Sequence, residues 1–371
     1  MVFLLFIFIM IPFSILDYGK KTFSVYYLEK YLFFFCLAYF IIIAGGRYYP
    51  GTGDWDHYRG TFEASGKIGD IRMLGYFEPG FELLANIIKT FSDHYVFFFT
   101  AYEVIVCVLL YYNIKNYLGY PITTCCLYFS IFFLTMDLIQ IRSLLAVQIF
   151  IFSIQFIKDR RIVPFVLCII CSTMIHITSI ILFPLYFVLD RRFKKRTLLL
   201  ITIIGVFINL LAIDLIVPIF GLISPLTGDY LNIKITAHML SAMVTRRPLG
   251  FIHIEFLFFF PLLMKYRKKL LDCDRYGNIF FNMFILYGMS IFYLWRVSVL
   301  SGRIKFFFIT SLIYLIPRFL KINKKIFILV FLFYGIYVLA MAIYTMFYQS
   351  SSAWVFSGLY SNYVNYFFSL M

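Results

Sequence analysis

A polar stretch between the first apolar runs carries residue types that could do chemistry on a sugar. It extends from Arg47 to Tyr58 and includes two glycines and Asp54. Asp54 could remove a proton as a general base, the ring of Tyr58 could stack on a sugar, and glycine lets the backbone approach a ligand closely. The alternative interpretation is a polar loop with a tight turn.

Within this stretch, Asp54 and Asp56 have the spacing of a metal-binding pair that could hold a cation against a diphosphate. The pattern is short, exposed aspartate pairs are common, and residues two apart point to different faces of a helix. We therefore expect no metal ion and no other cofactor.

Three arginines lie where an anionic substrate could bind, at Arg47, Arg142 and Arg303. A guanidinium stays charged at any biological pH and can hold phosphate oxygens through two parallel hydrogen bonds. We predict that Arg142 and Arg303 bind a diphosphate, with Arg47 as a third contact. The alternatives are an ion pair between Arg142 and Asp137, and a purely interfacial cation at Arg303.

A histidine, His176, lies in the middle of the apolar stretch 162–190. Imidazole titrates near neutral pH, so His176 could take the proton of an attacking hydroxyl. The alternative is a structural histidine among apolar neighbours. The sequence does not decide whether His176 or Asp54 is the base.

These residues must be positioned by membrane-spanning helices, because 63% of the 371 residues are hydrophobic and only 14% are charged. A soluble domain could not bury so much apolar surface. Uncharged runs such as Val2 to Ile15 and Ile326 to Phe347 approach the roughly 20 residues that span a bilayer. The net charge of +15 lies in short loops, which is typical of topology control and not of a nucleic-acid-binding face.

Basic loops predict which ends of the helices face the cytoplasm. Residues 162–190 have basic loops on both sides, so we predict two short helices, 162–175 and 176–189, that meet near His176 at the outer face. The same reasoning gives an all-α transmembrane bundle of about twelve crossings, with an amphipathic or re-entrant helix at 80–91. The chain is then one integral membrane domain, 1–371, with outer segments at 47–78, 221–248, 296–303 and 349–371.

Short motifs in matching order and topological position resemble the EpsG family, which is similar to the Wzy polymerases of O-antigen and capsule repeat units. The motifs are Arg47 with Gly53-Asp54 and Tyr58, Glu78 with Gly80, Ile141-Arg142 with Ala146, Met174-Ile175-His176 with Ser179, and Gly302-Arg303-Ile304. The resemblance covers nearly the whole chain. It implies an enzyme of the bacterial inner membrane that polymerises undecaprenyl-diphosphate-linked oligosaccharides at the periplasmic face, without a nucleotide sugar.

In such a reaction a hydroxyl of the incoming repeat unit attacks the anomeric carbon of the growing glycan, and undecaprenyl diphosphate leaves. The arginines would stabilise the leaving diphosphate, and His176 or Asp54 would take the proton. Tyr58 and Glu78 are expected to contact the glycan. The expected partners are the lipid-linked oligosaccharide, membrane lipids and a chain-length regulator, with no nucleic acid.

Three other functions fit parts of the sequence. A glycosyltransferase that uses polyprenyl-monophosphate sugars would also carry acidic residues in its first outer loop. A flippase for lipid-linked glycans would place cations along a central cavity and show repeated halves, whereas the arginines here gather on the predicted outer side. An acyltransferase acting on glycans is the third alternative.

Overall fold

The computed structural model describes residues 2–20, 22–49, 54–215, 249–272, 274–296, 298–322, 327–347 and 364–365. The described chain is almost entirely helical, as predicted, and divides into two compact units. The first unit combines Met1–Pro184 with Leu320–Met371, and the second is Leu185–Phe319. The predicted outer segments 221–248 and, apart from residues 364–365, 349–371 lie outside the described residues.

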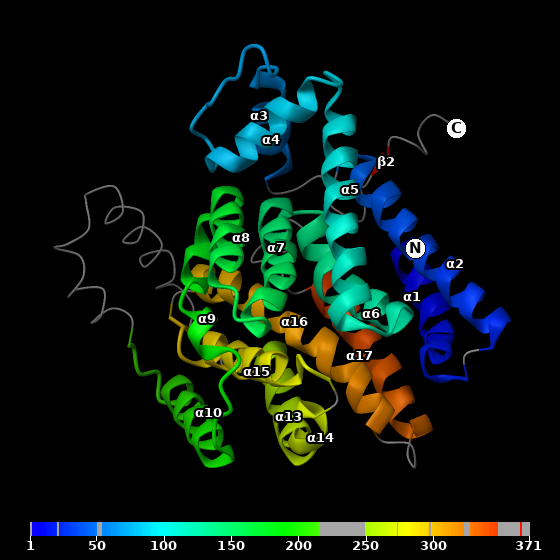
Figure 1. Ribbon diagram of the computed structural model, residues 1–371, viewed down its shortest axis with the longest axis vertical. Helices are drawn as coiled ribbons and strands as arrows, with labels where there is room; N and C mark the ends of the chain where they lie inside the picture. Colours follow the sequence, from blue (N-terminus) through cyan, green and yellow to red (C-terminus); the bar gives the residue numbers. More distant parts are fainter. Residues whose placement is uncertain are drawn as a thin grey trace. The chain divides into compact units, whose positions relative to one another are not determined.

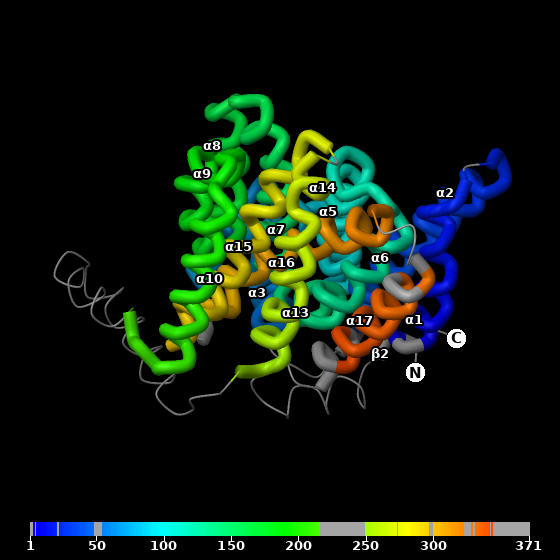
Figure 2. Tube along the Cα trace, turned by 90° about the horizontal axis from the view of Figure 1, so that it is seen from below, coloured from blue at the N-terminus to red at the C-terminus, as the bar shows by residue number. Residues whose placement is uncertain are grey.

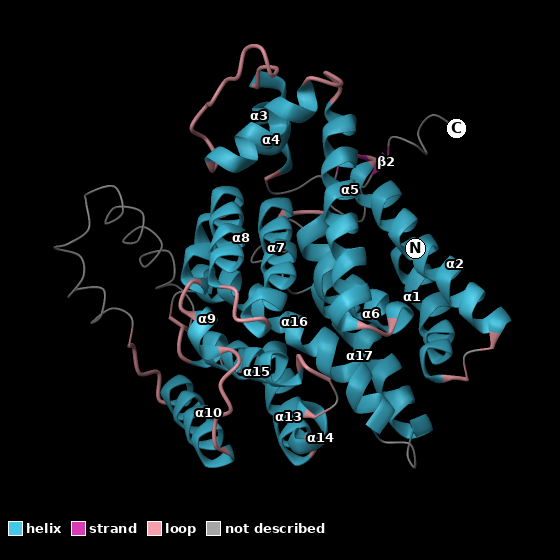
Figure 3. Cartoon of the chain, in the orientation of Figure 1, coloured by secondary structure: helices cyan, strands magenta, loops and turns pink. Residues whose placement is uncertain are grey.

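The first unit is a set of helices, several of them joined by short turns, with a long loop between α3 and α4 (Figures 1 and 3). A short 3₁₀ or π-helical segment is labelled η. In chain order the elements are α1 Val2–Phe13, η1 Ser14–Tyr18, α2 Phe23–Phe40, η2 Ile41–Gly45, β1 Arg47–Tyr49, α3 Trp55–Ala64, α4 Pro79–Lys89, α5 Tyr95–Asn113, η3 Ile114–Leu118, α6 Pro121–Tyr128, η4 Phe129–Asp137, α7 Ile141–Lys158, α8 Ile162–Ile175, η5 Ile177–Leu182, α17 Phe327–Phe347 and β2 Val364–Asn365. The strands β1 and β2 pair antiparallel.

Among the described residues, three helices are long and apolar enough to cross a membrane: Phe23–Gly45, Tyr95–Leu118 and Ile141–Lys158. The first two are 23 and 24 residues long, because in each an α-helix continues into a π-helical segment, α2 into η2 and α5 into η3. Shorter apolar stretches of 10–17 residues include Ile162–Ile175 and Gly277–Phe292. The helical membrane class is therefore supported, while the number of about twelve crossings stays a prediction.

Helix α8 has the pattern of a lipid-facing helix, with an apolar outer face and polar groups turned inward. Val163, Leu167 and Met174 are 66%, 56% and 40% exposed. Ser172 is buried, and its hydroxyl donates to the carbonyl of Ala146 on α7 at 3.0 Å. A hydroxyl that finds its partner inside the bundle suits a hydrocarbon environment, where water is absent.

The predicted helix break at His176 is confirmed. Helix α8 ends at Ile175, and His176 has an extended backbone with φ −152° and ψ 112°. The hydroxyls of Ser172 and Ser179 are 2.7 Å apart and join the two sides of the break. The single helix predicted for 176–189 is wrong, because the chain forms η5 and then the short helix α9, Leu185–Val188, with Pro184 between them.

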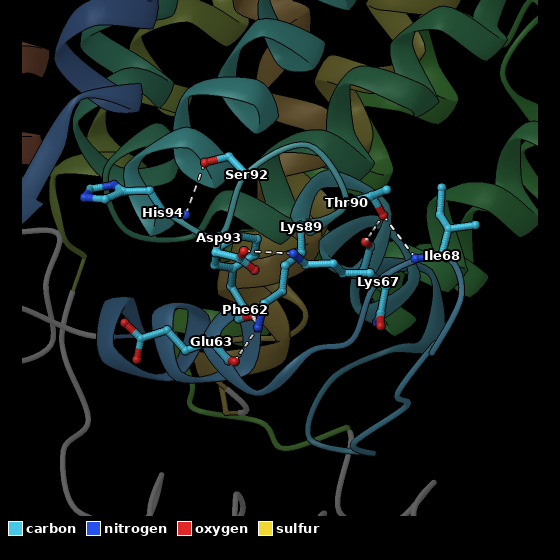
Figure 4. A network of polar contacts seen from close by, with 10 residues as sticks. Phe62, Glu63, Lys67, Ile68, Lys89, Thr90, Ser92, Asp93 and His94 are labelled. Atoms are coloured by element: carbon cyan, nitrogen blue, oxygen red, sulfur yellow. Dashed lines mark hydrogen bonds and ion pairs between the residues drawn. The ribbon is translucent and has the colours of Figure 1, made fainter.

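Helix α4 occupies most of the helix predicted at 80–91, and polar contacts tie its far end to the loop after α3 (Figure 4). The hydroxyl of Thr90 accepts from the backbone N–H of Ile68 at 3.1 Å, and Lys67 pairs with Asp93 at 2.8 Å. The loop from α3 to α4 is therefore held near its beginning by the residues that follow α4.

Helix α17 brings the C-terminal part of the chain back to the first unit. A Cβ added at Gly335 would lie 3.2 Å from Cγ2 of Ile11, so glycine allows α17 to approach α1 closely. The hydroxyl of Tyr334 donates to the carbonyl of Thr123 at 3.5 Å. Figure 2 shows α17 beside α1, although the two helices lie at opposite ends of the sequence.

The second unit is built around one buried helix. Its elements are α9, α10 Lys195–Leu210, α13 Phe251–Lys265, α14 Arg267–Leu271, α15 Gly277–Phe292 and most of α16 Ser298–Ile322. Helix α15 is buried along nearly its whole length. The hydroxyl of Tyr287 on this helix donates to Glu255 on α13 at 2.8 Å, and Arg318 pairs with Asp274 at 2.7 Å. The expectation of one membrane domain, 1–371, stays a prediction.

Candidate active site

Polar side chains from four separate segments converge in the first unit. Asp54 and Tyr58 come from the start of α3, Glu78 from the residue before α4, Arg142 from the first turn of α7 and His176 from the break after α8. Because α7 and α8 are joined by a short turn and run antiparallel, the start of one lies beside the end of the other. These residues are called the Arg142 cluster.

Arg142 lies at the centre of the cluster. Its Nη1 donates to Oε2 of Glu78, and its guanidinium carbon lies 4.1 Å from the centre of the Phe77 ring. The side chain is 13% exposed, so the charge is partly accessible. A guanidinium has five N–H donors, and Glu78 engages only part of this capacity. Arg142 can therefore hold an anionic ligand while it remains oriented by Glu78.

Glu78 connects Arg142 to His176. Its Oε1 accepts from the backbone N–H of Ile177 at 3.1 Å and lies 3.5 Å from Nδ1 of His176, while Oε2 accepts from Arg142. Burial opposes ionisation, but the hydrogen bond from His176 and the charge of Arg142 outweigh it and lower the pKa of Glu78 to about 2. The carboxyl is therefore ionised at any physiological pH.

His176 lies in the extended break between α8 and η5. The residue is 2% exposed, and its backbone N–H donates to the carbonyl of Ser172 at 2.8 Å. The geometry is that of a carboxylate–histidine pair, in which Glu78 orients the ring and stabilises it when it accepts a proton.

Tyr58 connects Arg142 to Asp54. Burial raises the pKa of Tyr58 above its usual value, and the positive charge of Arg142 offsets only part of this effect. The phenol therefore stays protonated, and its hydroxyl donates to Oδ2 of Asp54 at 3.2 Å. The ring is 2% exposed and packs against Phe77 and Phe81, with centroids 5.3 and 5.5 Å away.

Arg47 belongs to a separate buried group. It is 2% exposed, its Nη1 donates to the carbonyl of Asp137, and its guanidinium carbon lies 4.3 Å from the centre of the Phe99 ring. The carboxylate of Asp137 in turn accepts from the hydroxyl of Tyr128 at 2.8 Å. These contacts tie β1 to α5 and η4.

Comparison with known protein families identifies the family of this chain. The model of the EpsG family matches residues 30–368, nearly the whole chain. The chain belongs to the EpsG family. This is a family of Wzy-like polymerases, so the match agrees with the resemblance of the sequence motifs. No curated protein and no solved structure matches the chain.

For this EpsG-family chain, the structure brings together Asp54, Tyr58, Glu78, Arg142 and His176. Of the other predicted site residues, Arg47 lies in its own buried group, and Arg303 lies near the start of α16 in the second unit. In the part of the chain that the structure describes, no group of three or more His, Cys, Asp or Glu side chains could hold a metal ion.

One alternative interpretation and one expectation about individual side chains need correction. The structural alternative for Arg142, an ion pair with Asp137, is wrong, because Arg142 pairs with Glu78 whereas Asp137 contacts Arg47 and Tyr128. Tyr58 was expected to stack on a sugar, but its 2% exposure leaves no open ring face. Both errors concern contacts between residues distant in sequence.

Sequence reasoning missed two residues of this EpsG-family site. Phe77 stacks on Arg142, and its position next to Glu78 was the only signal. Tyr102 on α5 donates from its hydroxyl to the carbonyl of Ile141 at 3.1 Å, next to Arg142. A tyrosine in an aromatic-rich helix gives no sequence signal, because 22% of the residues in this chain are aromatic.

Proposed function

We propose that this protein is a glycosyltransferase of the bacterial inner membrane that polymerises undecaprenyl-diphosphate-linked oligosaccharide repeat units at the periplasmic face. The observation that carries the proposal is the Arg142, Glu78 and His176 arrangement, which puts a partly accessible cation beside a carboxylate–histidine pair. Membership of the EpsG family supports the same reaction class. We further propose that the reaction proceeds without a metal or other cofactor.

Arg142 is assigned to the leaving group. When the bond between the anomeric carbon and the diphosphate breaks, the electron pair goes to the diphosphate oxygen, and the guanidinium stabilises the developing negative charge. Glu78 and Phe77 fix the orientation of Arg142 before the substrate arrives, so little reorganisation is needed during the reaction. The expectation that Arg303 also contacts the diphosphate stays a prediction, whereas the burial of Arg47 gives that residue a structural role instead.

His176 is assigned the role of base. It takes the proton from the attacking hydroxyl as the oxygen bonds to the anomeric carbon, and the ionised Glu78 stabilises the imidazolium that results. Asp54 accepts a hydrogen bond from Tyr58, so we assign it to positioning Tyr58 beside Arg142. Glu78 likewise acts on Arg142 and His176 in this proposal and not directly on the glycan.

The test is reconstitution of the purified protein in liposomes that contain the cell's own undecaprenyl-diphosphate-linked repeat unit. A ladder of products that lengthens by whole repeat units supports the proposal. Incorporation of single sugars from a polyprenyl-monophosphate donor would favour the alternative glycosyltransferase. Movement of the unpolymerised lipid across the bilayer would favour the flippase.

Substitutions then test the assigned residues in the same assay. Arg142→Ala and His176→Ala should each reduce polymer formation by at least 100-fold, a loss comparable to removing one donor to an oxyanion. Arg72→Ala is the matched control, because Arg72 is 61% exposed and pairs with Asp70 on the surface. Full activity of Arg142→Ala would disprove the assigned role of this residue.

A further inference from the structure

The loop between α3 and α4 is fixed by side chains of α4. Oε2 of Glu82 accepts from the backbone N–H groups of Leu74 at 2.7 Å and Gly75 at 3.1 Å. Its Oε1 accepts from the N–H of Phe77 at 3.0 Å. Glu82 is 1% exposed, so a buried carboxylate holds three N–H groups in a four-residue segment.

Asn86 holds the loop one turn further along the same helix. Its Oδ1 accepts from the backbone N–H groups of Gly66 and Arg72, both at 2.9 Å, and its Nδ2 donates to the carbonyl of Arg72 at 3.0 Å. Glu82, Asn86 and Thr90 are spaced by four residues and so lie on one face of α4. This polar face determines the path of the loop backbone.

Tyr76 is the large side chain that this fixed backbone presents to the outside. It is 76% exposed, although the residues on both sides of it are bound to Glu82. Gly75, with φ +73°, supplies the turn that an L side chain rarely adopts. Phe77, the next residue, packs on Arg142 instead. The exposure of Tyr76 is thus a consequence of defined backbone geometry.

The position of Tyr76 relates it to the reaction site. It is two residues from Glu78, and two extended residues span at most about 7 Å. An aromatic ring can cover the apolar face of a sugar.

We propose that Tyr76 is a glycan-binding residue that stacks on a sugar of the lipid-linked repeat unit, next to the diphosphate held by Arg142. This inference rests on the proposed polymerase function and specifies its glycan subsite. It takes the stacking role that burial denies to Tyr58. Glu82 acts as a positioning residue, because it sets the backbone from which Tyr76 projects.

The test compares Tyr76→Ala, Tyr76→Leu and Tyr76→Phe in reconstituted liposomes, with the cell's own lipid-linked repeat unit as substrate. Stacking predicts a rise in KM of about tenfold for Ala and Leu, with kcat changed little and with Phe close to wild type. Phe91→Ala is the control, since Phe91 is 75% exposed at the other end of α4. If Leu keeps the wild-type KM, the side chain contacts lipid instead, and the proposal is overturned.

Glycan binding is also measured without turnover. The oligosaccharide released from the same lipid by mild acid is added to the full-length protein in detergent, and saturation-transfer NMR reports contact with sugar protons. The signals should weaken in Tyr76→Ala and persist in Tyr76→Phe; equal signals in all three proteins would overturn the proposal. A wild-type protein that makes no polymer but shows Tyr76-dependent binding would contradict the polymerase function alone.

Discussion

Arg47 and Arg142 are chemically identical, but their surroundings separate their roles. Arg47 is 2% exposed and donates to a backbone carbonyl, so its charge is committed to holding the fold together. The Arg142 side chain is 13% exposed and faces a carboxylate that can share it with a ligand. Removing a buried cation leaves its partners unsatisfied, whereas removing a partly open one mainly affects what it binds.

This difference gives a prediction for the two arginines. Arg47→Ala should lower the melting temperature in detergent and the yield of folded protein, because a buried interaction worth about 3 kcal/mol is broken. Arg142→Ala should lower the melting temperature less than Arg47→Ala does, because Glu78 keeps its contacts with His176 and Ile177, while polymer formation is abolished. Thermal unfolding monitored on both purified variants checks this, and a strongly destabilised Arg142→Ala with a stable Arg47→Ala would reverse the assignment.

Glu78 gives a pH prediction. A carboxyl whose pKa falls from its usual 4.5 to about 2 on folding adds stability above pH 4.5, and that contribution is lost as the pH drops through about 2. Glu78 therefore stays ionised across the working range. Glu78→Gln removes the anion beside the imidazole of the proposed base, so the acidic limb of kcat/KM should move to lower pH.

The pH–rate profiles of wild type and Glu78→Gln, measured on initial rates of polymer formation, check this. Glu63→Gln is the control, because Glu63 is a surface residue that pairs with Arg59 at 2.6 Å. An acidic limb that stays in place in Glu78→Gln would show that His176 does not sense Glu78.

At the scale of elements, the approach of α4 to α8 sets the geometry of the site. A Cβ at Gly80 would lie 2.8 Å from both the Cβ and the carbonyl oxygen of Met174, which are parts of the α8 end that cannot rotate away. Gly80 lies two residues after Glu78, and Met174 two residues before His176. The absence of a side chain at Gly80 therefore controls how close the carboxylate comes to the imidazole.

Gly80→Ala should accordingly push α4 away from α8, lengthen the Glu78 to His176 contact and reduce activity by about 100-fold, the loss that a 1 Å misplacement can cause. Gly60→Ala is the matched control, because nothing lies within 4 Å of the Cβ it would add on α3. Activity of both variants is compared with wild type. Equal activity of Gly80→Ala and Gly60→Ala would mean that this contact does not position the site.

The sequence predicted the positions of helices better than the side-chain contacts between residues distant in the chain. Basic loops on both sides of 162–190 were enough to predict the break at His176, because charge controls where a helix must reverse. The pairing of Arg142 with Glu78 spans 64 residues and depends on how α4 docks on the ends of α7 and α8, which no local pattern records. The hydrogen bonds of Glu82 to the loop were missed for the same reason.

At the scale of the whole molecule, the positions of the basic loops predict which side of the membrane the Arg142 cluster faces. Arg142 and Lys158 lie at opposite ends of α7, sixteen residues apart, which is about 24 Å of helix. If α7 crosses the membrane, the cluster must lie on the side opposite the Lys158 to Arg161 loop. The positive-inside rule then predicts that this loop is cytoplasmic and that the cluster lies on the outer side.

Cysteine labelling checks this arrangement in cells. In a background without native cysteines, a membrane-impermeant maleimide should label Arg72→Cys from outside, since Arg72 is exposed on the α3 to α4 loop. Arg160→Cys, on the loop between α7 and α8, should react only after the membrane is permeabilised. The reverse pattern would put Arg142 and His176 in the cytoplasm, where a periplasmic polymerase could not use them. Full polymer formation by both variants ensures that the labelled proteins are correctly folded.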